Sequence, residues 1–238
     1  MLTLFFVDDL PTTVGTKYEF ANEDANHAIH VLRMQSGGYF NLSDGKGNWS
    51  HVEILEVHKK HLTVIVLESG FQEPLETTFT IIQAIPKGDR IKEAIELCTE
   101  GGADRIVMWK AARSIGKSDD KIDKLQNTAR EASKQSRRFR IPAVLGVATT
   151  ANIIDEIAKV DLAVVFHESA TMKLSEVIVP GAKKIAIIIG PEGGLTDDEI
   201  DAFAAAGAKV ALMGRPILRS AHAGLAALSA INTALSVW

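Results

Sequence analysis

From residue 79 onward, short apolar runs alternate with stretches of helical periodicity, and this alternation limits the fold more than any other feature of the chain. Strands are expected at residues 79–85, 105–109, 162–166, 185–189 and 210–213. Several of these runs contain no polar residue, which is typical of parallel strands that are covered on both faces. We therefore predict an α/β fold with a mostly parallel sheet for residues 73–238.

Helical patterns fill the gaps between these strands. Apolar residues recur at helical spacing over residues 91–98, and Gly101-Gly102 ends that helix. A second helix is expected over residues 122–132. Thr196 and Glu199 form a capping box that opens a third. These helices complete the alternation that a parallel sheet requires.

Residues 1–72 have a different pattern, with short strands separated by turn signals. Strands are expected at residues 2–7, 39–43, 49–57 and 62–67, and one short helix at residues 25–32. The pattern breaks around Pro74. We therefore expect two domains, a compact and mostly β module over residues 1–72 and the α/β domain over residues 73–238.

The charge of the chain is informative only locally. A net charge of −4 gives no general attraction to a polyanion, so binding to nucleic acid would need a concentrated basic face. Residues 130–140 hold the densest cations, and their composition suits a phosphate backbone. A solvated helix face near a C-terminus would explain the same composition. The candidate RNA contacts are Lys134, Arg137, Arg138 and Arg140, together with Arg33.

Several classes of protein receive no support from the residues. Cys98 is the only cysteine, so the chain cannot form a disulfide or a cysteine-rich zinc site. Two histidine pairs, at residues 27/30 and 58/61, have no clustered third ligand, and no metal site is expected. The first residues lack the basic start of a secretory signal, and no apolar run is long enough to cross a membrane. We expect a cytoplasmic protein with no membrane partner.

Three loops at the carboxyl ends of predicted strands are the candidate binding site. The strand at 185–189 runs into a glycine-rich loop at residues 190–194, whose main-chain N–H groups can approach a ligand closely. This loop has neither the P-loop nor the dinucleotide-binding pattern, and an ordinary strand-to-helix turn is the alternative. The other loops are at residues 167–169 and 213–224. Ligands of open α/β sheets bind at this edge, so we expect the three loops to form one pocket.

Taken together, the motifs resemble those of the RsmE family of SPOUT-class enzymes, which methylate N3 of a uridine in 16S ribosomal RNA. The resemblance covers nearly the whole chain. Gly-Pro-Glu-Gly-Gly at residues 190–194, followed by Leu218-Arg219 after the last strand, is its most specific mark. The other marks are His30-Val31-Leu32-Arg33, Lys87-Gly88-Asp89-Arg90, Thr99-Glu100, Arg113-Ser114 and residues 132–138.

The resemblance implies a PUA-like N-terminal β-barrel domain that binds RNA and a SPOUT α/β domain with a deep trefoil knot. It also implies a homodimer that acts on the small ribosomal subunit. Residues 225–235 agree with the dimer independently, because a helix that is apolar nearly all round is buried on several sides. The implied cofactor is S-adenosyl-L-methionine, held by His167, Glu168, Ile189, Gly190, Pro191, Glu192, Gly193, Gly194, Met213, Gly214, Ile217, Leu218 and Arg219.

Three residues are candidates for the chemistry. Uridine N3 carries a proton at neutral pH, so its methylation needs a base or a cation that stabilises the developing anion. Arg138 and Arg219 are candidates for the cation. Glu192 is the candidate proton acceptor, and ordering of the glycine-rich loop is its alternative role.

The chain departs from the family pattern in two places. Ser220-Ala221-His222 replaces the acidic or hydroxyl pair that often follows Leu-Arg, and Leu97 and Gly101 stand where a lysine and a leucine are expected. These departures affect particular residue assignments more than the family assignment. Two other functions stay open. One is a noncatalytic RNA-binding or ribosome-assembly factor, against which the intact loop at 190–194 argues. The other is a SPOUT enzyme that acts on transfer RNA or on a ribose 2′-OH.

Overall fold

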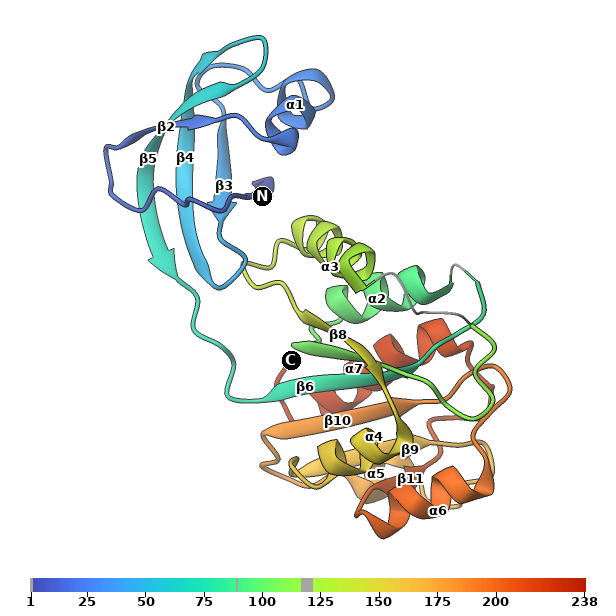
Figure 1. Cartoon of the computed structure of the whole chain (residues 1–238). Helices are drawn as coiled ribbons and strands as arrows, with labels where there is room; N and C mark the ends of the chain where they lie inside the picture. Colours follow the sequence, from blue (N-terminus) through green and yellow to red (C-terminus); the bar gives the residue numbers. More distant parts are fainter. Residues whose placement is uncertain (1, 89, 117–121) are drawn as a thin grey trace. The chain divides into compact units, whose positions relative to one another are not determined.

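The computed structural model describes residues 2–88, 90–116 and 122–238 of the chain (Figure 1). Asp89 of the motif at residues 87–90 lies outside these ranges. The chain divides into two compact units. Unit 1 contains Met1–Pro74 and Ser133–Ile141, and unit 2 contains Leu75–Ala132 and Pro142–Trp238. Each unit has its own strands and core.

Unit 1 is a five-stranded sheet in the order β1-β3-β4-β5-β2, with one helix. Its core contains Phe5, Phe20 and Phe40, whose ring centroids lie 5.3–5.5 Å apart. Tilted and edge-on aromatic rings of this kind bury a large apolar area in a small domain. The elements are β1 (Leu4–Phe6), β2 (Lys17–Phe20), α1 (Glu23–His30), β3 (Tyr39–Ser43), β4 (Asn48–Val57) and β5 (Leu62–Phe71).

The segment Ser133–Ile141 belongs to unit 1 through specific contacts. The Phe139 ring stacks on Trp49 at a centroid distance of 5.7 Å, and the Ser43 hydroxyl donates to the Phe139 carbonyl oxygen. Main-chain hydrogen bonds also join Gly47 N–H to Phe139 and Ile141 N–H to Gly45. A remote piece of the chain therefore completes the packing of unit 1.

Two expectations for this part of the chain need correction. The strand β2 was not expected, because only Phe20 of its residues is buried and an exposed edge strand gives no apolar run. The predicted helix at 25–32 is wrong at its C-terminal end, since α1 stops at His30 and Leu32 is 43% exposed. Arg33 has φ +53°, a left-handed conformation that cannot continue a helix.

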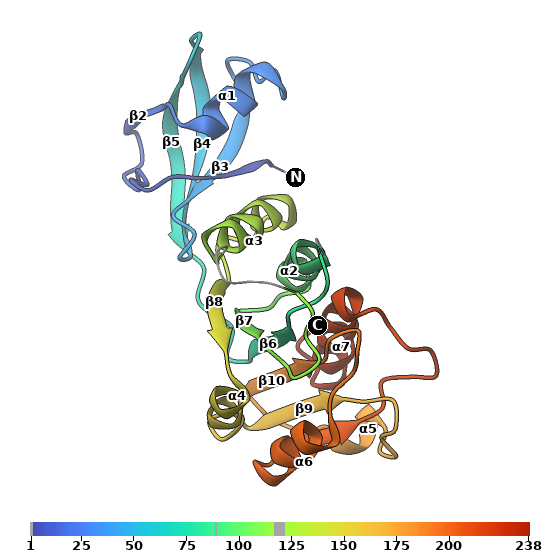
Figure 2. The ribbon, with the colours of Figure 1, turned by 45° about the vertical axis from the view of Figure 1, so that its right-hand side comes forward.

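Unit 2 contains a six-stranded sheet in the order β11-β9-β10-β6-β7-β8, and all neighbouring strands are parallel. Helices α2 and α7 cover one face, whereas α4 and α6 cover the other (Figure 2). The elements are β6 (Thr78–Ala84), α2 (Arg90–Glu100), β7 (Arg105–Trp109), α3 (Ile122–Ser136), β8 (Ala143–Ala148), α4 (Thr150–Ile157), β9 (Leu162–Phe166), α5 (Leu174–Val177), β10 (Lys184–Ile189), α6 (Asp197–Ala205), β11 (Lys209–Ala211) and α7 (Ser220–Ala234). The end of α3, from Ser133 onward, belongs to unit 1. The α/β prediction is confirmed.

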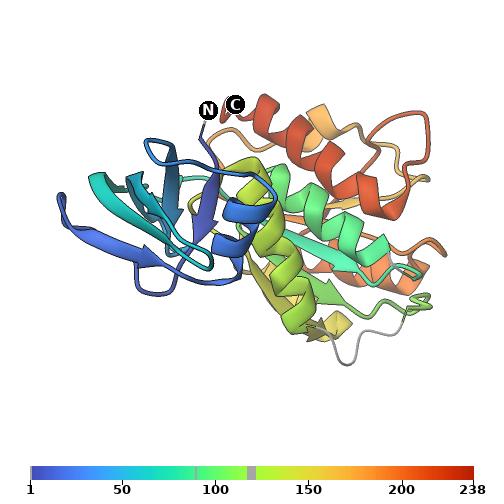
Figure 3. The ribbon, with the colours of Figure 1, turned by 90° about the horizontal axis from the view of Figure 1, so that it is seen from above.

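The helices α2 and α7 lie side by side at close range (Figure 3). A Cβ added to Gly224 would lie 2.5 Å from the Cys98 sulfur, and one added to Gly101 would lie 2.6 Å from a methyl group of Leu225. The departure at Gly101 therefore has a local explanation, because Leu225 occupies the space that a larger residue would need.

The strands of unit 2 match the sequence best where they are fully buried. The expected strands at 105–109 and 162–166 are confirmed. The strand expected at 210–213 is present as β11, but it begins one residue earlier and ends at Ala211, so Met213 lies in a loop. The edge strand β8 was not expected, since Val144 is its only buried residue. A strand that is half exposed lacks the apolar run that marks a central one.

Candidate functional site

The carboxyl ends of β9, β10 and β11 surround a cavity of about 670 Å³ in unit 2. All thirteen residues that the sequence assigned to a cofactor line it, from His167 and Glu168, through Ile189 and the loop at 190–194, to Met213, Gly214 and residues 217–219. Arg90 and Arg113 also line the cavity. The structure thus brings together three loops that are far apart in the sequence, as the parallel topology requires.

The glycine-rich loop has a fixed conformation. Gly194 has φ +72°, which favours glycine, and its N–H donates to the Pro191 carbonyl oxygen at 3.0 Å. The loop leads into α6 through a capping box in which the Thr196 hydroxyl accepts from Glu199 N–H. The chain direction therefore changes within a few residues, between the end of β10 and the start of α6.

Arg113 fastens this loop to the loop that follows β7. Its Nη1 donates to the carbonyl oxygens of Gly193 and Leu195, each at 3.2 Å. The Glu199 carboxylate accepts from Ala112 N–H at 2.7 Å and adds a second link. The sequence marked Arg113 as a family residue but gave it no role, and its partners are 80 and 82 residues away.

Most carbonyl acceptors of the loop are occupied, whereas several of its N–H donors are free for a ligand. The Gly190 oxygen accepts from Ser220, the Pro191 oxygen from Gly194, and two further carbonyls from Arg113. Within the described ranges, the N–H groups of Glu192, Gly193 and Leu195 have no partner. A loop of this kind suits a ligand with acceptor or anionic groups, such as the carboxylate of an amino acid.

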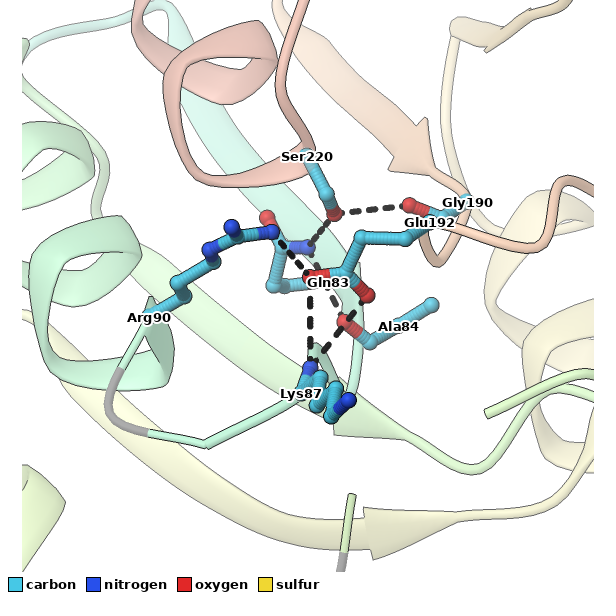
Figure 4. Close-up of polar contacts among 7 residues, drawn as sticks. All are labelled: Gln83, Ala84, Lys87, Arg90, Gly190, Glu192 and Ser220. Carbon is cyan, nitrogen blue, oxygen red and sulfur yellow. Dashed lines mark hydrogen bonds and ion pairs between the residues drawn. The ribbon is translucent and has the colours of Figure 1, made fainter. Parts of the chain in front are cut away.

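Glu192 is held by the segment that follows β6 (Figure 4). Its carboxylate accepts from Lys87 N–H at 3.2 and 3.3 Å and pairs with the Arg90 guanidinium at 3.2 Å. These contacts join two segments about a hundred residues apart. They favour the loop-ordering role of Glu192, because they tie the glycine-rich loop to the segment that follows β6.

A second network in Figure 4 contains a residue that the sequence prediction missed. Gln83 is fully buried in β6, and its amide nitrogen donates to the Ser220 hydroxyl at 2.9 Å. Ser220 in turn donates to the Gly190 carbonyl oxygen at 2.7 Å. The signal was a single glutamine within an apolar strand, since buried polar residues are more informative than exposed ones.

The cations predicted to bind RNA belong to unit 1, and they differ in their surroundings. Lys134 pairs with Asp24 at 2.6 Å, and both side chains are nearly buried. Arg140 donates to the Gln72 carbonyl oxygen and lies 4.9 Å from the centre of the Phe71 ring. Arg138 is half-buried, whereas Arg33 and Arg137 are exposed, with φ +53° and +59°.

The thiol of Cys98 does not line the cavity. Burial raises the pKa of the Cys98 thiol to about 12, so this side chain stays protonated at neutral pH. In the part of the chain that the structure describes, no cluster of three or more His, Cys, Asp and Glu side chains is arranged to bind a metal ion. No helix in the same ranges has the length and hydropathy of a membrane span.

The chain is similar to known proteins over nearly its whole length. Residues 73–232 match the family model of an RNA methyltransferase domain, and residues 20–67 match that of an RNA methyltransferase PUA domain. Ribosomal RNA small subunit methyltransferase E of Mycobacterium tuberculosis is 34% identical, with 99% of this chain and 93% of the relative covered. The Bacillus subtilis protein of the same name is 29% identical, with 97% and 93% covered.

Solved structures agree with this relationship. The putative methyltransferase Lpg2936 of Legionella pneumophila, in complex with S-adenosylmethionine, has a TM-score of 0.87 and 25% identity, and 98% of each chain is covered. Ribosomal RNA small subunit methyltransferase E of Neisseria gonorrhoeae, bound to S-adenosylmethionine, has a TM-score of 0.86 and 24% identity over the same shares. The second comparison supports the fold alone.

Proposed function

This chain belongs to the RNA methyltransferase family of ribosomal RNA small subunit methyltransferase E, and from this premise we propose that it transfers the methyl group of S-adenosylmethionine to N3 of a uridine in 16S ribosomal RNA. The observation that carries the proposal is the single cavity formed by three loops, with unpartnered N–H groups on the glycine-rich one. Its volume of about 670 Å³ suits a ligand of this size.

We propose that residues 1–72 are a PUA-like RNA-binding domain and that residues 73–238 are a SPOUT methyltransferase domain with a deep trefoil knot. The family matches at residues 20–67 and 73–232 support this division. The all-parallel sheet of unit 2 is compatible with it. The protein is proposed to act in the cytoplasm, on the small ribosomal subunit.

The residues of the cavity suit a proton-coupled methyl transfer. When bound, the cofactor supplies a methyl group on a positively charged sulfur. Its transfer to N3 of the uridine would release the N3 proton to an acceptor and would leave the cofactor as a neutral thioether. Arg219, which lines the cavity, is proposed to stabilise the negative charge that develops on the uracil ring. Arg138 belongs to unit 1 and does not line this cavity, and it is the second candidate for the same role. Glu192 is proposed to order the loop through Arg90 and Lys87, and to accept the proton if the ion pair opens.

A methylation assay tests the proposed function. The purified chain is incubated with the cofactor and with small-subunit ribosomal RNA, either free or assembled, and the modified nucleoside is identified by mass spectrometry. A methyl group on uridine N3 is expected. A methyl group on ribose or on another base would contradict the assignment of uridine N3. Modification of transfer RNA alone would contradict ribosomal RNA as the substrate.

Binding of the cofactor is expected to need no metal, because main-chain groups line the cavity. Calorimetry with S-adenosylmethionine in excess chelator measures this directly. Equal affinity with and without chelator is expected. Absence of binding in both conditions would favour the alternative function, a noncatalytic RNA-binding factor.

Arg137 and Arg140 of unit 1 are proposed to contact the RNA backbone. Replacing both Arg137 and Arg140 by alanine should weaken RNA binding and reduce the salt slope by about 1.4–1.8, since each lost phosphate contact removes about 0.7–0.9. Lys134 should contribute less, because Asp24 already neutralises it. Filter binding at several salt concentrations measures the slope, and calorimetry should show unchanged affinity for the cofactor.

A matched control removes the same amount of charge elsewhere. Arg105 and Lys159 both pair with Glu156 in unit 2, so their double alanine variant also loses two cations. Its salt slope should equal that of the wild type. Equal slopes in all three proteins would remove Arg137 and Arg140 from the RNA site.

A homodimer is proposed from the apolar surface of unit 2. The outer side of α7 leaves Leu225, Ala226 and Ala230 partly exposed, and Trp238 beyond it is 63% exposed. Apolar surface of this kind is typical of an interface between subunits. Light scattering at micromolar concentration should give twice the chain mass, and a monomer mass would contradict the proposal.

A further inference from the structure

We infer that Gln83 is a positioning residue of the cofactor cavity, which it shapes through the hydroxyl group of Ser220. This inference rests on the proposed function. Gln83 itself does not line the cavity, whereas Ser220 and Gly190 both do. The hydrogen bonds that connect the three residues are drawn in Figure 4.

The position of Gln83 in the sheet is fixed. It lies in β6, which pairs with β10 on one side and with β7 on the other. Its register partners are Ile189 of β10 and Met108 of β7. Its side chain is 0% exposed. A side chain in this position cannot turn toward solvent, so its amide must find its partners within the protein.

The direction of the hydrogen bonds follows from counting hydrogen atoms. The amide nitrogen of Gln83 has two, and it donates to the Ala84 carbonyl oxygen at 3.0 Å and to the Ser220 hydroxyl at 2.9 Å. Ser220 therefore accepts from Gln83, and its single hydroxyl hydrogen goes to the Gly190 oxygen at 2.7 Å. The opposite amide orientation would place the Gln83 oxygen against the Ala84 oxygen, which cannot donate.

This chain of hydrogen bonds joins two of the three loops around the cavity. Gly190 is the first residue after β10, and Ser220 is the first residue of α7, directly after Arg219. The bond between them sets the distance from the glycine-rich loop to the loop that ends with Arg219. Gln83 orients the hydroxyl that makes this bond. It therefore sets the spacing of the two loops, although it does not itself line the cavity.

The cost of Gln83 to stability argues for a role in function. Its Oε1 atom is buried and has no hydrogen-bond partner, and this side chain is fully described. An unsatisfied acceptor in a core is destabilising, and an apolar residue of similar size would avoid it. A polar residue at such a position is expected where the site needs a donor.

Four single variants and one double variant test the inference. Ser220→Ala removes the bond to Gly190, and Gln83→Met removes the amide donor at nearly constant volume. Ser220→Thr keeps a hydroxyl group. Ser229→Ala is the matched control, because Ser229 lies on the same helix and its hydroxyl bonds only to the Leu225 carbonyl oxygen of that helix. Calorimetry gives the affinity for S-adenosylmethionine, and thermal unfolding gives Tm.

We expect Ser220→Ala and Gln83→Met to weaken cofactor binding by about fivefold to tenfold, which is the value of one hydrogen bond. Ser220→Thr should bind within about twofold of the wild type, and Ser229→Ala should bind equally well. The double variant Gln83→Met/Ser220→Ala should bind no more weakly than Ser220→Ala, because Gln83 acts through Ser220.

The outcomes separate this inference from the proposed function. A wild-type chain that does not bind the cofactor contradicts the proposed function. A wild-type chain that binds, with single variants of unchanged affinity or with additive losses in the double variant, overturns the role of Gln83. Changes in Tm without changes in affinity also overturn it, since they indicate a purely structural residue. If Gln83→Met does not fold, unchanged affinity in Ser220→Ala still overturns the inference, because Gln83 is inferred to act only through the Ser220 hydroxyl.

Discussion

Replacing Gly194 by valine is expected to abolish binding of S-adenosylmethionine while unit 2 stays folded. Gly194 has φ +72°, and a β-branched residue in this conformation is strained by about 1–3 kcal/mol. The space around it is open, since the nearest atom to an added Cβ is Arg113 Nη1 at 3.8 Å. The loop therefore relieves the strain by changing its backbone, and its unpartnered N–H groups lose their positions.

Gly181→Val is a matched control for this variant. Gly181 also lies in unit 2, with φ +80° and no atom within 4 Å of an added Cβ, and it does not line the cavity. Both variants should lose a similar amount of stability, measured as Tm. Only Gly194→Val should lose the calorimetric signal with the cofactor. Retained binding in Gly194→Val would mean that the loop does not hold the ligand.

The second large effect is expected at Arg219. Arg219 lines the cavity, and its guanidinium has no hydrogen-bond partner in the described part of the chain, so it is available to a developing negative charge. Replacing it by alanine should lower the single-turnover rate of methylation by about 10²- to 10³-fold, as the loss of an oxyanion donor does elsewhere. With RNA and cofactor both at saturating concentrations, the single-turnover rate measures the chemical step.

Arg215→Ala is the control for the loss of charge at the cavity. Arg215 lies in the same loop, is exposed and also lines the cavity. Its loss should weaken binding at most and leave the rate at saturation nearly unchanged. Equal rate losses in the two variants would contradict a specific role for Arg219, because any cation of this loop would then have the same effect.

Arg138→Ala should also lower the rate at saturating RNA if its guanidinium reaches the uridine.

The sequence predicted the parts of the site that depend on local pattern and topology. Parallel strands place the loops that follow them at one edge of the sheet, so the loops after residues 166, 189 and 211 line one cavity in the structure. The capping box of Thr196 and Glu199 is likewise present. Such features are fixed by residues close together in the chain or by the order of its elements.

The sequence did not predict the partners of individual side chains. Glu192 bonds to Lys87 and Arg90, and Lys134 bonds to an aspartate 110 residues away. Contacts over such distances follow only from the tertiary fold, and no periodicity encodes them. The pairing of Lys134 also shows why a count of cations along a helix overstates the charge that a polyanion encounters.

The dependence of unit 1 on residues 133–141 has a consequence for biogenesis. Synthesis proceeds from the N-terminus, and nascent domains generally fold as units when their residues become available. The stacking of Trp49 on Phe139 and the bonds from Ser43 and Gly47 cannot form until this later segment has left the ribosome. The N-terminal module therefore completes its folding only after about half of the α/β domain has been made, and a fragment that ends at Pro74 would lack part of its own native packing.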